Sequence, residues 1–156
     1  MCYMFSMKTV YGLKALQFMA SRGANEYLLI SEIAEHEKIP KKFLETILLT
    51  LKNEGLLTSK IGKGGGYQLA FPPSSITMER VVSALEGPLA LVPCVYEETG
   101  SKCEYCDDSS VCGVRLMMTG LTEEFTQSLG SKTLHDMQTM TEEAIQNSKG
   151  LINYTI

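Results

Sequence analysis

The feature that most limits how this chain can fold is a glycine-rich segment, Gly62-Lys63-Gly64-Gly65-Gly66. It lies between two short runs typical of strands, at residues 56–61 and 67–71. Glycine adopts the backbone conformations that tight turns require, so the segment predicts a β-hairpin. A phosphate-binding loop also contains glycines and a lysine, but it needs a hydroxyl residue and must enter a helix. Because Gly66 enters an alternating Tyr-Gln-Leu-Ala run, we reject that alternative.

Three helices are predicted before the hairpin. Residues 8–22 carry apolar side chains at helical spacing. Ser31 suits the cap of a short second helix that runs to His36, and Pro40 suits the first turn of a third helix that Gly55 ends. The third helix has one apolar stripe, formed by Phe43, Leu44, Ile47, Leu48 and Leu51. Two short helices, a tight turn and a following hairpin predict a winged helix-turn-helix domain.

The rest of the chain predicts three further helices. Thr77 suits the cap of a fourth helix that Gly87-Pro88 closes, and residues 94–112 have the Gly, Ser and Asp content of a loop. Residues 112–129 then show a strong helical pattern, and residues 133–147 a shorter, acidic one. The apolar side chains of the long pattern are Val114, Leu116, Met117, Leu121, Phe125 and Leu129. A small winged helix could not cover this much apolar surface, which predicts a dimerisation helix, although core packing would give the same pattern.

The expected fold is mainly α with a small β-hairpin, in three parts. Residues 1–88 form the winged helix-turn-helix domain and residues 89–112 a cysteine-rich loop. Residues 113–156 form the dimerisation helix and a C-terminal helix. No stretch approaches the ~20 apolar residues of a membrane span. Residues 1–8 lack the charged start and apolar run of a signal peptide. We therefore expect a cytoplasmic protein with no membrane partner.

Charge is divided unevenly along the chain. The total of −4 would by itself disfavour a nucleic-acid partner. Up to Ser75, however, the chain has nine Lys and Arg and six Glu, a net charge of +3. The residues after Ser75 include five Lys and Arg and twelve Asp and Glu, a net charge of −7. Between Lys38 and Lys63 six Lys face only Glu45 and Glu54, a balance of +4. Such a stretch suggests a face that meets a polyanion, although a solvated helix surface has the same pattern.

The cysteines are also unevenly placed. Cys2 stands alone, whereas Cys94-x8-Cys103-x2-Cys106-x5-Cys112 places four thiols within nineteen residues. In a cytosolic chain such clustering favours a metal centre or redox chemistry over structural disulfides. Four thiolates suit an iron–sulfur cluster and suit zinc equally well, so residue type does not separate the two. A thioredoxin-like site at residues 103–106 would need a βαβ unit that the pattern lacks, while a cluster-free thiol switch stays open.

An ordered set of motifs runs from about Ser6 to Leu129. The motifs are Lys8-x-x-Tyr11-Gly12-Leu13-x-Ala15-Leu16, Ile33-Ala34, Ile39-Pro40-x-x-Phe43-Leu44-Glu45-x-Ile47-Leu48, Leu51-Lys52-x-x-Gly55-Leu56-Leu57-x-Ser59, Gly64-Gly65-Gly66-Tyr67-x-Leu69-Ala70, Ile76-Thr77 and Ala84-Leu85-Glu86-Gly87-Pro88. With the downstream cysteines, this set resembles the Rrf-two family of bacterial winged-helix transcription regulators, which includes IscR-, NsrR-, RirA- and CymR-like proteins. No single motif is diagnostic, but the ordered set is highly specific.

The resemblance implies a transcription regulator rather than an enzyme, acting as a homodimer on a double-stranded DNA operator. The third helix would be the recognition helix, with its first turns at the DNA, and the hairpin would be the wing. In that arrangement the residues expected at the DNA are Lys41, Lys42, Glu45 and Thr46 from the helix, and Lys60, Lys63, Gly64, Gly65 and Tyr67 from the wing. Many family members carry Arg just before the wing glycines, whereas Ile61 stands there in this chain.

The resemblance also implies an iron–sulfur cluster, which many members hold on three cysteines and one other ligand. In IscR-like proteins that ligand is a His three residues after the last cysteine, where this chain has Arg115. In others it is an acidic residue of the first helix, and residues 8–22 contain none. The additional Cys103 would replace the missing ligand. We therefore expect a [2Fe–2S] or [4Fe–4S] cluster on Cys94, Cys103, Cys106 and Cys112.

The expected function is thus a DNA-binding regulator, with repression as the expected mode, whose operator affinity depends on a cluster in the cysteine loop. A zinc-bound regulator and a cluster-free thiol switch of the same fold are the alternatives. A thiol oxidoreductase is the less favoured third.

Overall fold

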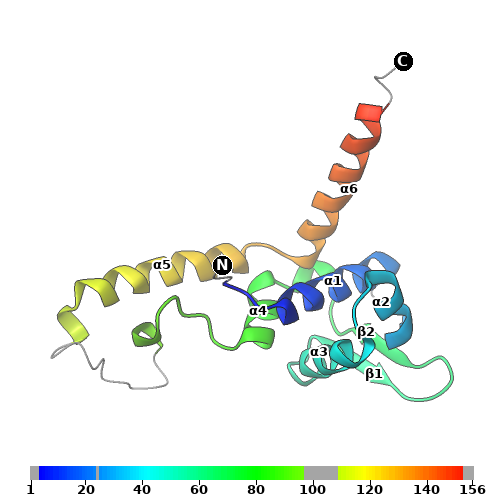
Figure 1. Ribbon diagram of the computed structural model, residues 1–156, viewed down its shortest axis with the longest axis horizontal. Coiled ribbons are helices and arrows are strands. Elements are labelled where there is room, and N and C mark those ends of the chain that lie inside the picture. The colour runs from blue at the N-terminus through cyan, green and yellow to red at the C-terminus, as the bar shows by residue number, and fades with distance from the viewer. Residues whose placement is uncertain (1–3, 24, 97–108, 153–156) are drawn as a thin grey trace.

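The structure is a computed structural model that describes residues 4–23, 25–96 and 109–152 (Figure 1). Within these residues the fold is mainly α with one small antiparallel hairpin, as predicted. The longer elements are α1 (Met7–Arg22), α2 (Ile30–Glu37), α3 (Lys41–Asn53), β1 (Leu57–Lys60), β2 (Gly66–Leu69), α4 (Met78–Glu86), α5 (Gly113–Gly130) and α6 (Leu134–Ile152). The described residues also form the short 3-10 helices η1 (Pro73–Ser75), η2 (Pro93–Val95) and η4 (Ser109–Val111). No helix of the described chain is long and apolar enough to cross a membrane.

One hydrophobic core holds the first four helices together. Helix α1 packs against α2, α3 and α4, and α3 packs against α2 and α4. The predicted stripe of α3 is confirmed at four positions, since Leu44, Ile47, Leu48 and Leu51 are fully buried. Burying each such side chain contributes about 1.5–3 kcal/mol. Phe43 was wrongly assigned to this stripe, because it lies at the edge of the first turn and is 42% exposed.

The helix ends follow most of the predicted signals. Pro40, expected in the first turn of the third helix, instead precedes α3 as its N-cap residue. Gly55, at φ 71°, follows the end of α3, and Arg80 N donates a hydrogen bond to the capping hydroxyl of Thr77 at 3.3 Å. The prediction that Ser31 caps α2 is wrong, because α2 begins after Leu29 and Ser31 lies inside its first turn. The physical reason is a pairing upstream. Leu28 and Tyr67 exchange two backbone hydrogen bonds of 2.9 Å, which keeps Leu28 extended and fixes where α2 can begin.

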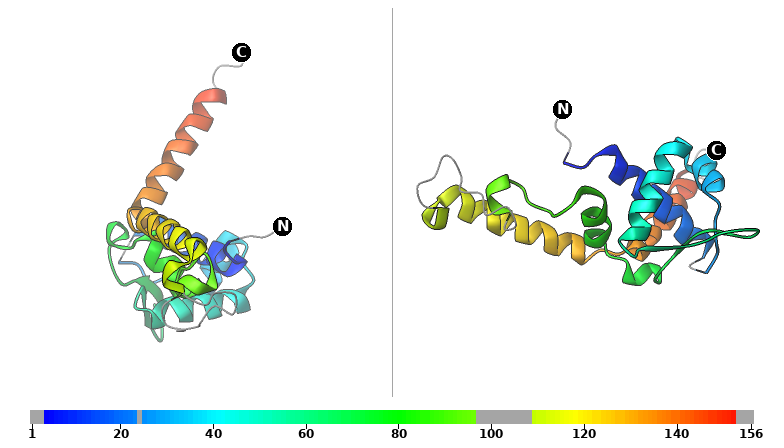
Figure 2. Two further views of the ribbon diagram at one scale, coloured as in Figure 1. Left: turned by 90° about the vertical axis from the view of Figure 1, so that its left-hand side faces the viewer. Right: turned by 90° about the horizontal axis from the view of Figure 1, so that it is seen from below.

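The hairpin forms the wing, and the chain before α2 pairs with it. Strands β1 and β2 are antiparallel, with Leu57 opposite Leu69 and Lys60 opposite Gly66. Gly66 has φ 146°, and a Cβ there would overlap the carbonyl of Leu28. Glycine at this position therefore permits the close approach of the α1–α2 linker, which attaches the base of the wing to the helical domain. In Figure 2 the hairpin projects from the end of the molecule opposite the start of α5.

Helices α5 and α6 extend away from the core domain (Figures 1 and 2). Helix α5 packs against α4, η2 and η4, and its exposed apolar side chains include Val114, Leu116 and Met117, which are 64%, 61% and 67% exposed. Helix α6 is longer than predicted. It is anchored at its start, where Leu134 is fully buried and its N–H donates to Ile76 O at 2.8 Å.

The carboxylate of Glu86 joins the end of α4 to the start of α1. Its Oε1 accepts hydrogen bonds from Ser6 N at 2.8 Å, Ser6 Oγ at 2.7 Å and Thr9 Oγ1 at 2.5 Å. Partial burial raises the pKa of Glu86, but these hydrogen bonds and the charge of Lys8 outweigh it, so the pKa lies below its usual 4.5. A negative charge at the start of a helix also interacts favourably with the helix dipole.

Glu86→Ala should lower the free energy of unfolding at pH 7 by about 1 kcal/mol, the usual effect of losing a helix cap. Because the pKa of Glu86 is lowered by folding, its contribution is present above the pKa of the unfolded chain and is lost as the pH falls through the folded value. The difference from wild type should therefore shrink in urea unfolding at pH 3. Glu35→Ala, at an exposed position of α2, is the control, and the same pH dependence in both variants would contradict the assignment.

Candidate nucleic-acid interface and cysteine loop

The first turns of α3 present polar side chains to solvent. Because the buried stripe of α3 faces the core, Lys41, Lys42, Glu45 and Thr46 lie on its other side, and all four are exposed. These residues were expected at the start of a recognition helix, and in the structure they lie in the first turns of α3, whose contact with DNA stays a prediction. Neither lysine forms a salt bridge with any residue that the structure describes. Their charges are therefore available to phosphate groups.

The wing presents a second set of cations. Lys60 ends β1, Lys63 follows in the turn, and both are exposed, as is Gly64 at φ 75°. Gly65 is buried instead, with its N–H donating to Gly62 O at 2.9 Å. A Cβ at Gly65 would overlap the Lys60 carbonyl, so this glycine shapes the turn. A direct contact between Gly65 and DNA stays a prediction.

A groove of about 380 Å³ brings the two sets together. Lys41 and Glu45 line it from α3, and Lys60, Ile61 and Tyr67 from the wing. The groove also includes residues that the sequence reasoning missed. These are Leu29, Ile30 and Ser31 at the start of α2, Ser59 in β1 and Gly66 in β2, with Ile61 added from the wing tip. The start of α2 reaches this groove because Leu28 pairs with Tyr67 of the wing, and a pairing between residues so far apart in the sequence leaves no local pattern.

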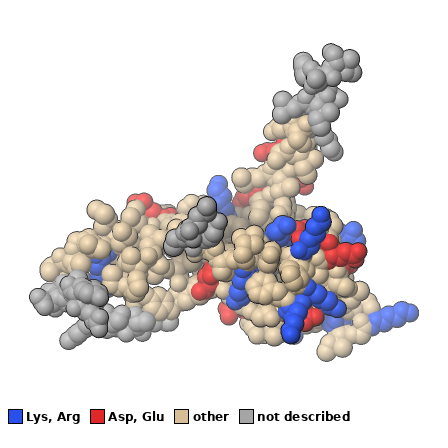
Figure 3. Space-filling view, in the orientation of Figure 1, with Lys and Arg blue, Asp and Glu red and all other residues tan. Residues whose placement is uncertain are grey.

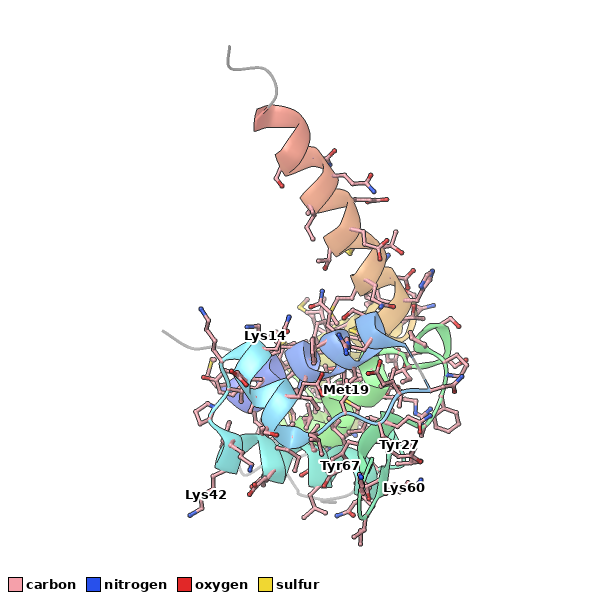
Figure 4. All side chains as sticks on the ribbon, turned by 90° about the vertical axis from the view of Figure 1, so that its right-hand side faces the viewer. Lys14, Met19, Tyr27, Lys42, Lys60 and Tyr67 are labelled. Carbon is pink, nitrogen blue, oxygen red and sulfur yellow. The ribbon has the colours of Figure 1, made fainter. Side chains whose placement is uncertain are left out.

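The surface charge follows this arrangement. Figure 3 shows Lys and Arg gathered over the core domain on the face drawn, whereas the surface of α5 is largely uncharged. In Figure 4, Lys60 lies beside Tyr67 at the lower edge of the domain, and Lys42 lies farther along the same edge. The edge formed by α3 and the wing thus combines exposed cations with a groove, which suits the backbone of a nucleic acid.

Two of the four candidate metal ligands belong to the described chain. Cys94 lies in η2 and Cys112 directly before α5, both half-buried and neither in a disulfide. Arg115 lies in the first turn of α5, and its Nε donates to the carbonyl oxygen of Cys94 at 3.0 Å. This hydrogen bond ties the segment that carries Cys94 to the helix that begins after Cys112.

Cys103 and Cys106 lie outside the described residues. Among those that are described, no three His, Cys, Asp or Glu side chains come together as a metal site. The four-cysteine site therefore stays a prediction. The four cysteines fit the expected iron–sulfur cluster, because thiolates are the usual ligands of such clusters. The two described thiols, those of Cys94 and Cys112, also lie at the same end of α5.

The sequence matches one family over most of its length. The profile of the Rrf2 (Rrf-two) family, described as "Iron-dependent Transcriptional regulator", matches residues 5–140. A protein of Rhodobacter capsulatus named as an rrf2-like HTH-type transcriptional regulator is 34% identical over 137 residues, covering 86% of this chain and 91% of its own length.

Solved structures show the same fold. CymR (YrzC), the global cysteine regulator of B. subtilis, superposes with a TM-score of 0.71 at 26% identity, covering 89% of this chain and 98% of its own. IscR of T. potens superposes with a TM-score of 0.70 at 27% identity, covering 91% and 90%. The fold, the ordered motifs and the extent of the family match agree, and this chain belongs to the Rrf2 family of transcriptional regulators.

Proposed function

We propose that this protein binds a double-stranded DNA operator as a homodimer and represses transcription in the cytoplasm. The observation that carries the proposal is the groove in which the start of α3 and the wing meet, rimmed by Lys41 and Lys60. A helix whose first turns are exposed can enter the major groove with those turns at the base edges. The wing then lies over the neighbouring backbone. Glu45 is exposed and lines the same groove as Lys41 and Lys60, and its carboxylate can accept a hydrogen bond from cytosine N4.

The dimer is proposed from the apolar face of α5. Val114, Met117 and Leu121 recur at helical spacing and are 64%, 67% and 43% exposed. Burying a continuous apolar stripe is the main source of association energy between helices. A second copy of the same helix supplies a complementary apolar surface, and two-fold symmetry matches a palindromic operator. Adjacent major grooves on one face of DNA lie roughly 34 Å apart. The dimer would therefore fix the spacing of its two winged helix-turn-helix domains, which are called the reading heads below.

Control by an iron–sulfur cluster on Cys94, Cys103, Cys106 and Cys112 is the proposed regulatory mechanism. When bound, such a cluster would supply one-electron redox chemistry and sensitivity to oxidants. The protein's part is to hold the thiols, with Arg115 tying the Cys94 segment to α5. Because α5 packs against α4 of the reading head, a change in the cysteine loop can alter how the reading head sits on the dimerisation helix.

A cluster-free thiol switch is the second candidate, and the likeness to CymR, a cysteine regulator by its name, favours it. Zinc is the third occupant that four thiolates would accept. The three are separated by one measurement on the anaerobically purified protein. An iron–sulfur protein is brown and contains iron and sulfide, a zinc protein is colourless and contains zinc, and a thiol switch contains neither.

Lys41→Ala and Lys42→Ala should each weaken binding to all DNA sequences and lower the slope of log K against log salt by about one. Each lysine that contacts a phosphate releases about one counterion, which is the physical reason. The operator is first obtained by selecting bound sequences from a random duplex pool with the full-length protein. Fluorescence anisotropy at several salt concentrations then gives the slopes.

Lys132→Ala is the matched control, because Lys132 is exposed in the connection between α5 and α6, away from the wing (Figure 1). Its slope should equal that of wild type. Unchanged slopes for Lys41→Ala and Lys42→Ala would remove α3 from the interface, and failure to select any sequence would contradict the proposed function itself.

A further inference from the structure

The chain before α1 connects the winged-helix domain to α5. Residues 4–6, called the N-terminal strap here, lie next to the end of α4 and to α5. The Phe5 ring stacks on the Phe125 ring of α5, with 6.1 Å between the ring centroids and 24° between the ring planes. The strap is therefore a second connection between α5 and the winged-helix domain, in addition to the packing of α5 on α4.

The two ends of the strap are held with unequal strength. At the end next to α1, Ser6 N and Ser6 Oγ donate to Glu86 Oε1 at 2.8 and 2.7 Å. Hydrogen bonds to a charged group are roughly twice as strong as those between neutral groups. At the other end the strap meets α5 through the Phe5–Phe125 stack, and an aromatic pair adds only modestly to the area that it buries. The contact with α5 is thus the weaker of the two.

The packing around this weaker contact is incomplete. A cavity of about 210 Å³ lies beside the stack, lined by Met4 and Phe5 of the strap, by Leu91 and by Phe125 of α5. Walls that do not meet forfeit dispersion contacts, whereas a close-packed side chain touches neighbours on every side. The strap therefore rests on α5 without filling the space around it, and it can leave α5 at little cost.

The segment that leads to the cysteine loop reaches the same place. Leu91 N donates to Thr122 Oγ1 at 3.4 Å, and Thr122, which is 8% exposed, lies one turn before Phe125 on α5. The strap and this segment thus contact adjoining parts of one helix. Residues 88–91 form one wall of the cavity, so a shift of this segment alters the surface on which the strap rests.

We propose that the N-terminal strap holds α5 in one orientation relative to the winged-helix domain while Phe5 rests on Phe125, and releases that orientation when the contact opens. Packing against α4 alone leaves α5 free to pivot on that face, whereas a second contact from the start of α1 removes this freedom. The inference goes beyond the proposed function and rests on it only where DNA binding is the readout.

Amide hydrogen exchange of the full-length protein tests the strap without DNA. Phe5→Ala removes the stack and should speed exchange in residues 88–91 and in α5 around Phe125 by about two- to tenfold, the range expected for one aromatic pair. Because Phe125→Ala removes the same contact from the other side, Phe5→Ala should have little further effect in a Phe125→Ala background.

Two variants serve as controls for the exchange experiment. Phe5→Tyr keeps the ring and should exchange like wild type. Phe71→Ala also removes a partly exposed ring, since Phe71 is 41% exposed, but this ring pairs with Arg80, 5.0 Å from its centroid, and not with α5. Exchange in residues 88–91 should therefore be unchanged in Phe71→Ala.

The orientation is read from operators that differ in half-site spacing. In the operator selected with the full-length protein, one base pair is added between the half-sites, which turns one half-site by about 35° relative to the other. Wild type should bind this operator more weakly than the selected one. Phe5→Ala should narrow the difference by about two- to tenfold, since a released α5 lets the domains follow the added turn, and should bind a single half-site like wild type.

Unchanged exchange at residues 88–91 in Phe5→Ala, or an equal effect of Phe5→Ala with and without the Phe125 ring, would overturn the strap. Faster exchange with an undiminished spacing preference would overturn its role in orientation and leave the proposed function standing. Failure to select any DNA would contradict the proposed function, and the exchange experiment would still decide whether the strap holds α5.

Discussion

Met117→Asp should convert the proposed homodimer into monomers and lower operator affinity by about 100-fold or more. Met117 is 67% exposed on the outward face of α5, in line with Val114 and Leu121. A carboxylate buried between two apolar helices is unpaired and strongly destabilises their association. Once the heads are separated, the second half-site no longer benefits from the effective concentration that the first provides, an advantage of about 10²–10⁴.

Sedimentation or light scattering gives the oligomeric state, and anisotropy with full and half operators gives the affinity. Met140→Asp is a matched control, because Met140 is also 67% exposed but lies on α6. It should remain dimeric. An equal loss in Met140→Asp would place the interface on α6, and a Met117→Asp protein that stayed dimeric would exclude this face of α5.

Cys112→Ser should abolish iron binding and the visible absorbance of the anaerobically purified protein. A thiolate is a far better ligand for this type of cluster than a hydroxyl group. Cys112 sits directly before α5, at the helix end that favours negative charge. Iron and sulfide analysis with an absorption spectrum measures the effect. The same loss is expected for Cys94→Ser, and operator binding by either variant should no longer respond to an iron chelator.

Cys2→Ser is the matched control for this experiment. Cys2 is the one cysteine of the sequence outside the 94–112 segment, and its replacement should leave iron content unchanged. Full iron content in Cys112→Ser would remove this residue from the ligand set. A colourless wild-type protein with stoichiometric zinc would replace the cluster by zinc, and a metal-free protein with reversible oxidation would favour the thiol switch.

The sequence predicts local structure well where a single periodicity or turn residue decides the outcome. The stripe from Leu44 to Leu51, the cap at Thr77 and the stop at Gly55 are of this kind, because helix geometry and backbone conformation act within a few residues. Phe43 and Ser31 were misassigned because neighbours distant in sequence decide them. Phe43 lies edge-on to Tyr11 of α1, and the start of α2 depends on Tyr67 of the wing.

The candidate site was predicted only in part for the same reason. The winged-helix arrangement and the family resemblance, not the charge balance, placed Lys41, Lys42, Lys60 and Lys63 at the expected DNA surface, and the structure brings Lys41 and Lys60 to one groove. The side chains that complete the groove at the start of α2 could not be found without the pairing of Leu28 with Tyr67. The grouping of the cysteines rests on their spacing, and the described chain contributes the tie between Arg115 and Cys94.

The pairing of Leu28 with Tyr67 has a mechanical consequence. It makes the linker before α2 a third short strand beside the wing, so wing, linker and helix-turn-helix share one hydrogen-bonded body. The fully buried residues Leu16 and Leu44 join this body from α1 and α3. Such a body has few internal degrees of freedom. In the proposed mechanism, a signal that arrives through α5 would therefore change the orientation of each winged-helix domain as a whole and leave its affinity for its own half-site intact.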